Sequence, residues 1–298
     1  MTYARLAPFR NPKTAQLSLF ARHLPAQKLI RQTEETTMDE IITEHSESIL
    51  RVELNRPAKK NALTSSMYVA LANIFNDAAK DEGTRVVLWH GAGDSFCAGN
   101  DVEDFLKNPP GPGESPQAKL MNALIDFDKP LIAAVQGAAV GSGTTMLMHC
   151  DFVYAGESAK FQMPFINLAV VPEFGSSCSV PARIGHIRAA ELILLGLPFD
   201  AKRAVDLGLV TQAISDGQLL AIATETARKL AAKPAEALRA SKRLMKEPFR
   251  EQIKAAMKAE NEAFSARIRS EEAKEALTAF LEKRPPDFTR IRNSARAA

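Results

Sequence analysis

Two glycine-containing turns about forty residues apart are the part of this sequence best suited to chemistry. Each follows a short apolar run that is typical of a strand, with FCAGND at 96–101 and VGSGT at 140–144. Glycine lets a backbone approach a ligand closely and present its N–H groups, and a turn that leads into a helix adds the positive end of a dipole. Either turn alone is more simply a tight connection. Together they predict an enzyme that polarises the carbonyl of a thioester or ester.

The composition is that of a globular protein with one large domain or two smaller ones. Of the 298 residues, 46% are hydrophobic and 24% are charged, and no apolar run approaches the ~20 residues of a membrane helix. Cys97, Cys150 and Cys178 are odd in number and form no CxxC pair. We therefore expect no disulfide framework, no metal site and no membrane partner.

Positive charge is concentrated at the N-terminus, where residues 1–33 contain six basic residues and no acidic residue. Removing these six charges from the total of +3 leaves −3 for the rest, which argues against a nucleic-acid-binding surface. The composition of 1–33 is typical of an organelle transit peptide, and it equally fits an extension upstream of Met38 as the working start. We favour the extension and expect a cytoplasmic protein, or a mitochondrial one if residues 1–33 are a transit peptide.

Strand, turn and helix recur in this order along the chain, which indicates an α/β fold. A helix capped by Thr64 is expected to run to about Lys80. From Pro181 onward the pattern predicts helices only. The expected strands lie within 41–56 and at 85–90, 130–136, 152–155 and 159–162. The expected helices lie at 64–80, 115–127, 143–149, 185–195, 200–207, 216–232, 234–246, 250–270 and 271–282.

Four segments, in order, resemble the crotonase superfamily of enoyl-CoA hydratases and isomerases over about 41–288. They are RPAKKNAL at 56–63, FCAGND at 96–101, PLIAAVQG at 130–137 with GSG at 141–143, and FLEKRPPDF at 280–288. The resemblance implies a spiral of ββα units with a helical C-terminal region that associates into homotrimers or homohexamers. It also implies an acyl-CoA thioester substrate and no separate cofactor, since coenzyme A is part of the substrate.

The domain organisation expected from this resemblance has three parts. Residues 1–37 form an N-terminal extension that is disordered or a leader. Residues 38–233 form the crotonase-like ββα core with the acyl-CoA site, and residues 234–298 form the helical region for oligomerisation.

The resemblance assigns the two turns specific roles, in which the N–H groups of Ala98 and Ser142 form an oxyanion hole. The family has glycine at position 142, so a serine there requires backbone angles that allow a Cβ. The resemblance also implies binding of coenzyme A by Lys59 and Lys60 and, in the C-terminal tail, by Lys283 and Arg284, which reach the 3′-phosphate of a neighbouring subunit's ligand. The remaining predicted substrate-binding residues are Ala62, Leu63, Gly99, Asn100, Asp101, Val140, Gly141 and Phe165.

The acid and base of the hydratases have no counterparts in this chain. Their two glutamates correspond to Thr145 and Phe165, and neither side chain transfers protons at neutral pH, which argues against ordinary hydratase activity. Glu173, in VVPEFGSS at 170–177, resembles the single catalytic glutamate of Δ3,Δ2-enoyl-CoA isomerases. Phe165 and Phe174 are expected to raise the pKa of this glutamate.

The leading hypothesis is therefore isomerisation of 3-enoyl-CoA to 2-enoyl-CoA through a dienolate, with Glu173 as the proton shuttle. A second hypothesis keeps the oxyanion hole and uses Glu173 for hydration, dehalogenation or thioester hydrolysis. A third is an acyl-CoA-binding protein without catalysis. A simpler interpretation of Glu173 is an acid that stabilises the dipole of the helix that follows it.

Overall fold

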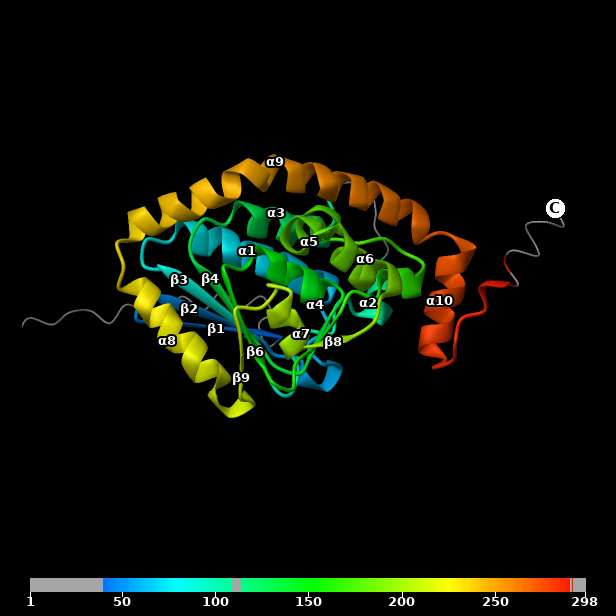
Figure 1. The fold of residues 1–298 in the computed structure, drawn as a ribbon, viewed down its shortest axis with the longest axis horizontal. Coiled ribbons are helices and arrows are strands. Elements are labelled where there is room, and N and C mark those ends of the chain that lie inside the picture. The colour runs from blue at the N-terminus through cyan, green and yellow to red at the C-terminus, as the bar shows by residue number, and fades with distance from the viewer. Residues whose placement is uncertain (1–39, 109–113, 290, 292–298) are drawn as a thin grey trace, which may run out of the picture. The chain divides into compact units, whose positions relative to one another are not determined.

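The computed structural model describes residues 40–108, 114–289 and 291, all of which belong to one compact unit, Glu35–Ala298. The predicted N-terminal extension, 1–37, lies outside the described residues. Strands and helices alternate through most of the unit, and its C-terminal part is helical (Figure 1). The predicted α/β class is confirmed.

A six-stranded sheet with the strand order β1-β2-β3-β4-β6-β9 forms the centre of the fold. β1 and β2 form an antiparallel hairpin, and the other neighbouring strands are parallel. The strands are β1 (Ile41–Ser46), β2 (Ile49–Leu54), β3 (Val86–Gly91), β4 (Leu131–Val135), β6 (Phe152–Gly156) and β9 (Gln212–Ile214).

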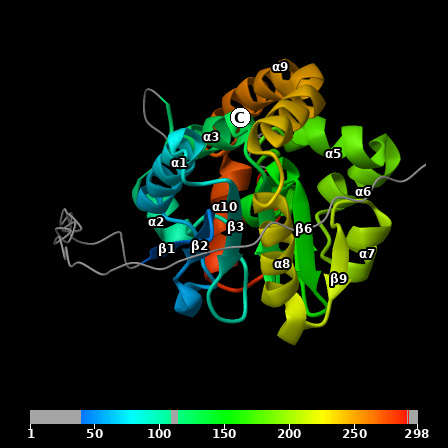
Figure 2. The ribbon, with the colours of Figure 1, turned by 90° about the vertical axis from the view of Figure 1, so that its left-hand side faces the viewer.

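Helices cover both faces of this sheet, as expected for parallel strands. Successive side chains of a strand point to opposite faces, so Val87 and Trp89 join one hydrophobic cluster while Val86 and Leu88 join another. The first cluster includes residues of α1 and α3, and the second includes residues of α8 (Figures 1 and 2). These helices are α1 (Ser65–Lys80), α3 (Pro116–Asp126) and α8 (Leu219–Ala231). The cap predicted for α1 is confirmed, since Thr64 Oγ1 accepts the Met67 N–H at 3.3 Å.

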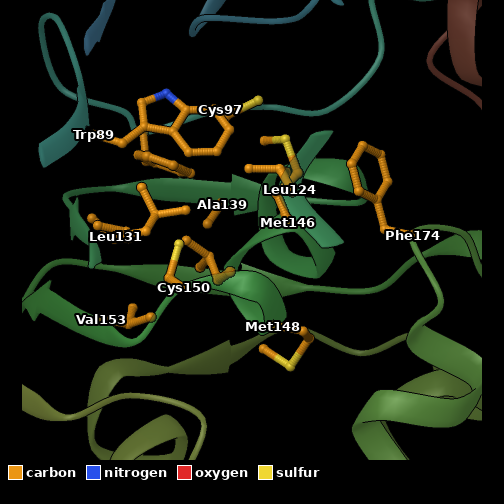
Figure 3. Packing of buried hydrophobic residues seen from close by; sticks show 14 of the residues in the cluster. Trp89, Cys97, Leu124, Leu131, Ala139, Met146, Met148, Cys150, Val153 and Phe174 are labelled. Atoms are coloured by element: carbon orange, nitrogen blue, oxygen red, sulfur yellow. The ribbon is translucent and has the colours of Figure 1, made fainter. Parts of the chain in front are cut away.

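The first cluster also fixes where the first glycine turn begins. The fully buried Trp89 ring packs edge-on against the Phe75 ring of α1 and against the Phe96 ring. The distances between ring centroids are 5.2 Å and 5.7 Å, respectively. Figure 3 shows Trp89 and Cys97 within this cluster, together with Phe174 from the segment that contains Glu173. The packed core therefore holds the segments that carry the predicted chemistry.

A smaller three-stranded sheet, with the order β5-β7-β8, carries the second glycine turn directly after β5. The prediction of helices only after Pro181 is wrong, because β8 joins this sheet and β9 joins the large one. Each has at most three residues, too few to show an alternating pattern. The strands of the small sheet are β5 (Ala138–Val140), β7 (Lys160–Gln162) and β8 (Phe199–Asp200). Of the shorter helices, α4 (Ser142–Thr145) and α7 (Ala201–Asp206) pack against this sheet. The others are α2 (Val102–Lys107), α5 (Ser176–Ile184) and α6 (His186–Leu195).

A single long helix, α9 (Ala235–Arg267), runs over α3 and α5 towards α10 (Glu271–Leu281) (Figure 1). The predicted break between 246 and 250 is therefore wrong. Pro248 removes one hydrogen bond to the Leu244 carbonyl, but Leu244 is exposed, so water can reach that part of the helix. Just after Pro248, Arg250 binds Asp126 at 2.9 Å and Asp128 at 2.8 Å, which ties the helix to the end of α3.

Candidate active site

The two glycine turns lie side by side in the structure. The Cys97 N–H donates to the Ala138 carbonyl at 3.0 Å, and the Val140 N–H donates to the Cys97 carbonyl at 2.9 Å. Gly143 is required at this contact, since a Cβ there would lie 2.2 Å from the Cys97 carbonyl oxygen. The tertiary structure therefore brings together the two backbone segments that the sequence singles out.

At the first turn, the N–H group that is available differs from the expected one. The Ala98 N–H donates to the Lys60 carbonyl at 2.9 Å, so the expectation that it is free to bind a ligand does not hold. Asn100 forms an isolated parallel bridge with Leu63, which directs its own N–H away from Leu63. Among the described residues, this N–H donates no hydrogen bond. Asn100 therefore supplies the unoccupied backbone donor of this turn.

At the second turn, Ser142 is the first residue of α4, and its N–H has no partner within the helix. The positive φ of this turn, 57°, falls on Gly141, while Ser142 has a negative φ. A serine is therefore accommodated without backbone strain. The Ser142 N–H donates to the carboxylate of Glu173.

Glu173 is a buried carboxylate, with 5% of its surface exposed. Burial raises its pKa to about 7; the Glu260 carboxylate also raises it, while hydrogen bonds from the Asn100 side chain and the Ser142 N–H lower it. Phe174, which follows it, is fully buried. The predicted direction of the pKa shift is confirmed, and at neutral pH the group can both accept and return a proton.

A buried tyrosine joins the side chains of the two turns. The Tyr68 hydroxyl of α1 lies 2.8 Å from Asn100 Oδ1 and 2.8 Å from Ser142 Oγ. Because a hydroxyl has one proton and the amide oxygen can only accept, Tyr68 donates to Asn100 and accepts from Ser142. The Asn100 amide N–H is then directed to Glu173. This chain of hydrogen bonds fixes the orientation of the Asn100 side chain.

Two cavities meet at Glu173. One, of about 370 Å³, extends from the two turns to α10, and the other, of about 510 Å³, lies between α3 and α9. Both cavities are lined by Asn100, Glu173, Phe105 and Phe264. The two phenyl rings pack edge-on, with their centroids 5.9 Å apart. A ligand that spans both cavities would therefore pass directly over the Glu173 carboxylate.

Several of the predicted substrate-binding residues line the smaller cavity together with residues from α10. The predicted ones are Ala98, Gly99, Asn100, Val140, Gly141 and Phe165. Arg284 also lines this cavity, whereas the neighbouring Lys283 does not.

The other predicted binding residues support the first turn or lie on the surface. Asp101 caps α2 by accepting the Asp104 N–H at 3.0 Å, and it pairs with Arg56 at 3.0 Å. The Arg56 side chain also donates to the Ala62 carbonyl at 2.6 Å. Lys59 forms an exposed ion pair with Glu103 at 3.4 Å. The Lys60 carbonyl accepts the Ala98 N–H, and the side chain of Leu63 is buried in the core.

The positions that correspond to the two hydratase glutamates hold no acid. Thr145 is buried, and its hydroxyl donates to the Gly141 carbonyl at 3.3 Å. Phe165 is buried against the smaller cavity. Among the described residues that line both cavities, only Glu173 carries a carboxylate.

Sequence reasoning missed Tyr68, which binds the side chains of Asn100 and Ser142, and Glu260, whose carboxylate raises the pKa of Glu173. Tyr68 lies within the apolar face of α1, where its type suggested only core packing. Glu260 belongs to a helix rich in charged residues, and it is buried although most of its acidic neighbours are exposed. No local signal in the sequence distinguishes either one, because their partners lie far away in the chain.

Neither a metal centre nor a membrane span is found in the part of the chain that the structure describes. Within it, no three His, Cys, Asp or Glu side chains gather in a way that would hold a metal ion. No helix there combines the length and apolar character needed to cross a membrane. The cellular compartment stays a prediction.

Comparison with known proteins identifies the family. The family model for enoyl-CoA hydratase/isomerase matches residues 44–291. The chain is 32% identical over 252 residues to 2,3-dehydroadipyl-CoA hydratase of Escherichia coli K12, covering 84% of this chain and 99% of that protein. It is 34% identical over 243 residues to enoyl-CoA delta isomerase 2 of Rattus norvegicus, covering 80% of this chain and 62% of that protein.

A solved structure gives the same result for the fold. The crystal structure of an enoyl-CoA hydratase/isomerase from Pseudoalteromonas atlantica T6c superimposes with a TM-score of 0.80 and 37% identity, covering 84% of this chain and 99% of that one. The predicted crotonase-like fold is confirmed. The chain belongs to the enoyl-CoA hydratase/isomerase family of the crotonase superfamily.

Proposed function

We propose that this protein converts 3-enoyl-CoA thioesters into 2-enoyl-CoA thioesters, with Glu173 as the group that moves the proton. The observation that carries the proposal is the buried carboxylate of Glu173, which lines both cavities beside Asn100, whose N–H donates no hydrogen bond among the described residues. The positions of the two hydratase glutamates hold Thr145 and Phe165. The relatives include a hydratase and an isomerase at similar identity, so the proposal depends on the site itself.

The chemistry requires one base that acts twice. Glu173 takes a proton from C2 of the 3-enoyl thioester, and the electrons of the C2–H bond spread over the thioester carbonyl and the C3–C4 double bond. The resulting dienolate receives the same proton back at C4, which leaves the double bond between C2 and C3. No atom is gained or lost, so a single carboxyl group is sufficient.

The oxyanion hole of this proposal uses the Asn100 N–H in place of the Ala98 N–H, together with the Ser142 N–H. In the structure, the Ser142 N–H donates to Glu173. When Glu173 takes up the proton, it becomes a weaker acceptor just as negative charge develops on the thioester oxygen. The N–H group then binds the oxyanion more strongly than it binds the substrate, which is what lowers the barrier.

The cavities suggest how an acyl-CoA binds. The coenzyme A part occupies the 370 Å³ cavity beside the turns and α10, and the acyl part extends into the 510 Å³ cavity between α3 and α9. Lys283 and Arg284 remain the proposed partners for a phosphate; Arg284 lines the first cavity and is paired with Glu275 and Glu282. No separate cofactor takes part, because coenzyme A belongs to the substrate.

We also propose that the protein assembles into a homotrimer or homohexamer. The α6 region leaves apolar side chains uncovered, with exposed fractions of 85% for Ile187, 64% for Leu194 and 60% for Leu197. Exposed apolar surface of this kind is typical of subunit interfaces. The molar mass from light scattering tests this, and a monomer would contradict it.

The function is tested by replacing the proposed base in Glu173→Gln. We expect kcat for 3-enoyl-CoA to fall by about 10²–10⁴, while the affinity for a non-reacting acyl-CoA stays within about twofold. The control is Glu157→Gln, which removes an exposed carboxylate. Turnover that survives in Glu173→Gln would refute the assignment.

A product screen across 3-enoyl, 2-enoyl and aromatic acyl-CoA thioesters separates the alternatives. Formation of 2-enoyl-CoA from 3-enoyl-CoA supports the isomerase. Hydration of 2-enoyl-CoA as the main reaction, or tight binding with no turnover of any thioester, would replace it.

A further inference from the structure

The helix that follows Glu173, α5, has no local cap at its start. Its N-cap residue is Gly175, which has no side chain to accept an N–H. The acceptor comes from α9, 85 residues further along the chain: Glu260 Oε2 accepts the Gly175 N–H at 2.7 Å, and Oε1 accepts the Ser177 N–H at 2.8 Å. Burial raises the pKa of the Glu260 carboxyl, while these two N–H donors oppose the shift by stabilising its ionised form.

The backbone between Glu173 and α5 is strained and needs external support. Phe174 and Gly175 have φ values of 61° and 67°, and this left-handed conformation is unfavourable for a residue with a side chain. Burial lowers the pKa of His149 to about 4, so this histidine is neutral at pH 7 and donates from Nε2 to the Phe174 carbonyl at 2.9 Å. Glu260 holds the next peptide group, at Gly175. Together the two contacts fix the turn that orients Glu173.

The carbonyl of Glu173 is itself attached to the start of α5. It accepts the Ser176 hydroxyl at 2.6 Å and the Ser176 N–H at 3.2 Å. A shift of the first turn of α5 would therefore move Glu173 directly. Because Glu260 binds the residues on both sides of Ser176, the α9 carboxylate controls the position of this turn.

We propose that Glu260 is a positioning residue for Glu173, acting through its two hydrogen bonds to the start of α5. This inference rests on the proposed function, in which Glu173 must reach both C2 and C4 of the substrate. Small displacements of a catalytic group strongly reduce the rate. Glu260 lies behind the turn and touches no substrate atom in this scheme.

The negative charge of Glu260 gives the inference a readout that a purely structural role would lack. Glu173 interacts electrostatically with the Tyr68 hydroxyl from α1, the Cys97 thiol from the first turn and the Glu260 carboxylate from α9. Burial raises the pKa of Tyr68 well above 10 and that of Cys97 to about 12, so both are neutral at pH 7. Glu260 is the charged member of this set, and its charge raises the pKa of Glu173.

Two substitutions separate position from charge. Glu260→Gln keeps the length of the side chain, but it removes the charge and replaces one of the two accepting oxygens by an NH₂ group. Glu260→Asp keeps the charge, but its shorter side chain cannot reach both N–H groups. The matched control on α9 is Glu251→Gln, an exposed position outside both cavities.

We expect kcat to fall about tenfold or more in both Glu260 variants, with KM for the acyl-CoA within about twofold. In Glu260→Gln the acid limb of the kcat/KM profile moves to lower pH, because loss of the negative charge favours the ionised form of Glu173. In Glu260→Asp this limb stays near its original pH. Hydrogen exchange at the Gly175 and Ser177 amides becomes faster in both variants and is unchanged in the control.

The inference is overturned if Glu260→Gln keeps the kcat and the acid limb of the unaltered protein. It is also overturned if kcat falls only in proportion to the folded fraction, with the acid limb and the amide exchange unchanged. If the unaltered protein does not isomerise 3-enoyl-CoA, the proposed function fails separately. In that case the pKa of Glu173 is followed by its carboxyl infrared band, which is identified by its loss in Glu173→Gln. Exchange of the Gly175 and Ser177 amides still reports whether Glu260 holds the start of α5 in place.

Discussion

Two cavities of similar size are lined by the two halves of α9, and each contains an ionisable group with a pKa near 7. The first half lines a cavity of about 500 Å³ that contains Lys246, and the second half lines the 510 Å³ cavity that contains Glu173. Burial is the main cause of both shifts, lowering the pKa of Lys246 to about 7 and raising that of Glu173 to about 7.

The two lysines of α9 that line the first cavity are bound to backbone and carboxylate oxygens. Lys246 Nζ donates to the carbonyls of Leu124 and Phe127 at the end of α3, both at 3.1 Å. Lys242 Nζ binds Asp151 at 2.7 Å and the Lys129 carbonyl at 2.7 Å. These lysines join α9 to the end of α3 and to the segment before β6.

In the second cavity, a backbone donor remains available beside the carboxylate. The Asn100 N–H donates no hydrogen bond among the described residues, and the Ser142 N–H is shared with Glu173. A perturbed pKa is common to ion-pair networks and active sites. An uncommitted backbone N–H next to the titrating carboxylate, and not the pKa alone, therefore distinguishes the reactive region.

If the two regions have different roles, the largest effect on stability without an effect on activity is expected for Lys242→Met. This change leaves the Asp151 carboxylate without its cation, so we expect the free energy of unfolding to fall by about 3 kcal/mol. kcat for 3-enoyl-CoA should stay within about twofold, because Lys242 lies outside the site. Urea unfolding and steady-state kinetics measure the two quantities, with the exposed Lys233→Met as control. A large loss of kcat in folded Lys242→Met would show that the two regions are coupled.

Asn100→Ala is expected to have the opposite effect to Lys242→Met, with the loss in activity and not in stability. It keeps the backbone N–H but removes the amide that donates to Glu173, and a hydrogen bond to a charged group contributes about 1.5–3 kcal/mol. We expect kcat/KM to fall at least tenfold and the acid limb of its pH profile to move to higher pH, because the ionised form of Glu173 loses a donor. The control is Asn108→Ala at the exposed end of α2. An unmoved acid limb would refute the proposed role of the amide.

The smallest effect is a difference in how stability depends on pH. The pKa of Glu173 is raised on folding, so its contribution to stability is present at low pH and is lost as the pH rises towards 7. Glu173→Gln should therefore gain stability relative to the unaltered protein as the pH rises from about 4.5 to 7. The pKa of Lys246 is lowered on folding, so the folded state becomes more stable as the pH rises from about 7 to 10.5.

Lys246→Met should accordingly gain stability relative to the unaltered protein near pH 7. This relative gain should disappear as the pH rises to about 10.5. Unfolding in urea at several pH values measures both variants against the unaltered protein. Parallel stability curves for either pair would contradict the assigned pKa.

Much of the fold could be predicted because its signals are local. Thr64 caps α1 and apolar residues repeat on one face of that helix, while buried runs such as Val86–Gly91 stand out between polar turns. Pro248 was misleading as a helix break, since ion pairs with α3 stabilise α9 just beyond it. β8 and β9 were missed because strands of two or three residues depend on their neighbours for pairing.

The candidate site was predicted at the level of its segments and not of its individual donors. The motif around Glu173 indicated the carboxylate, and the predicted rise in its pKa is confirmed. The choice between the Ala98 and Asn100 N–H groups depended on the Lys60 carbonyl, which folds against the first turn.

The sequence by itself determined the family, the two turns and the single carboxylate, because each depends on residue types at short spacing. Only the tertiary structure decided which N–H groups stay free, which cavity surrounds Glu173, and that Glu260 holds the turn beside it. The physical reason is that hydrogen-bond satisfaction and desolvation are set by whatever packs against a group. For Glu173 the charged group that raises its pKa is a carboxylate from a helix near the other end of the chain.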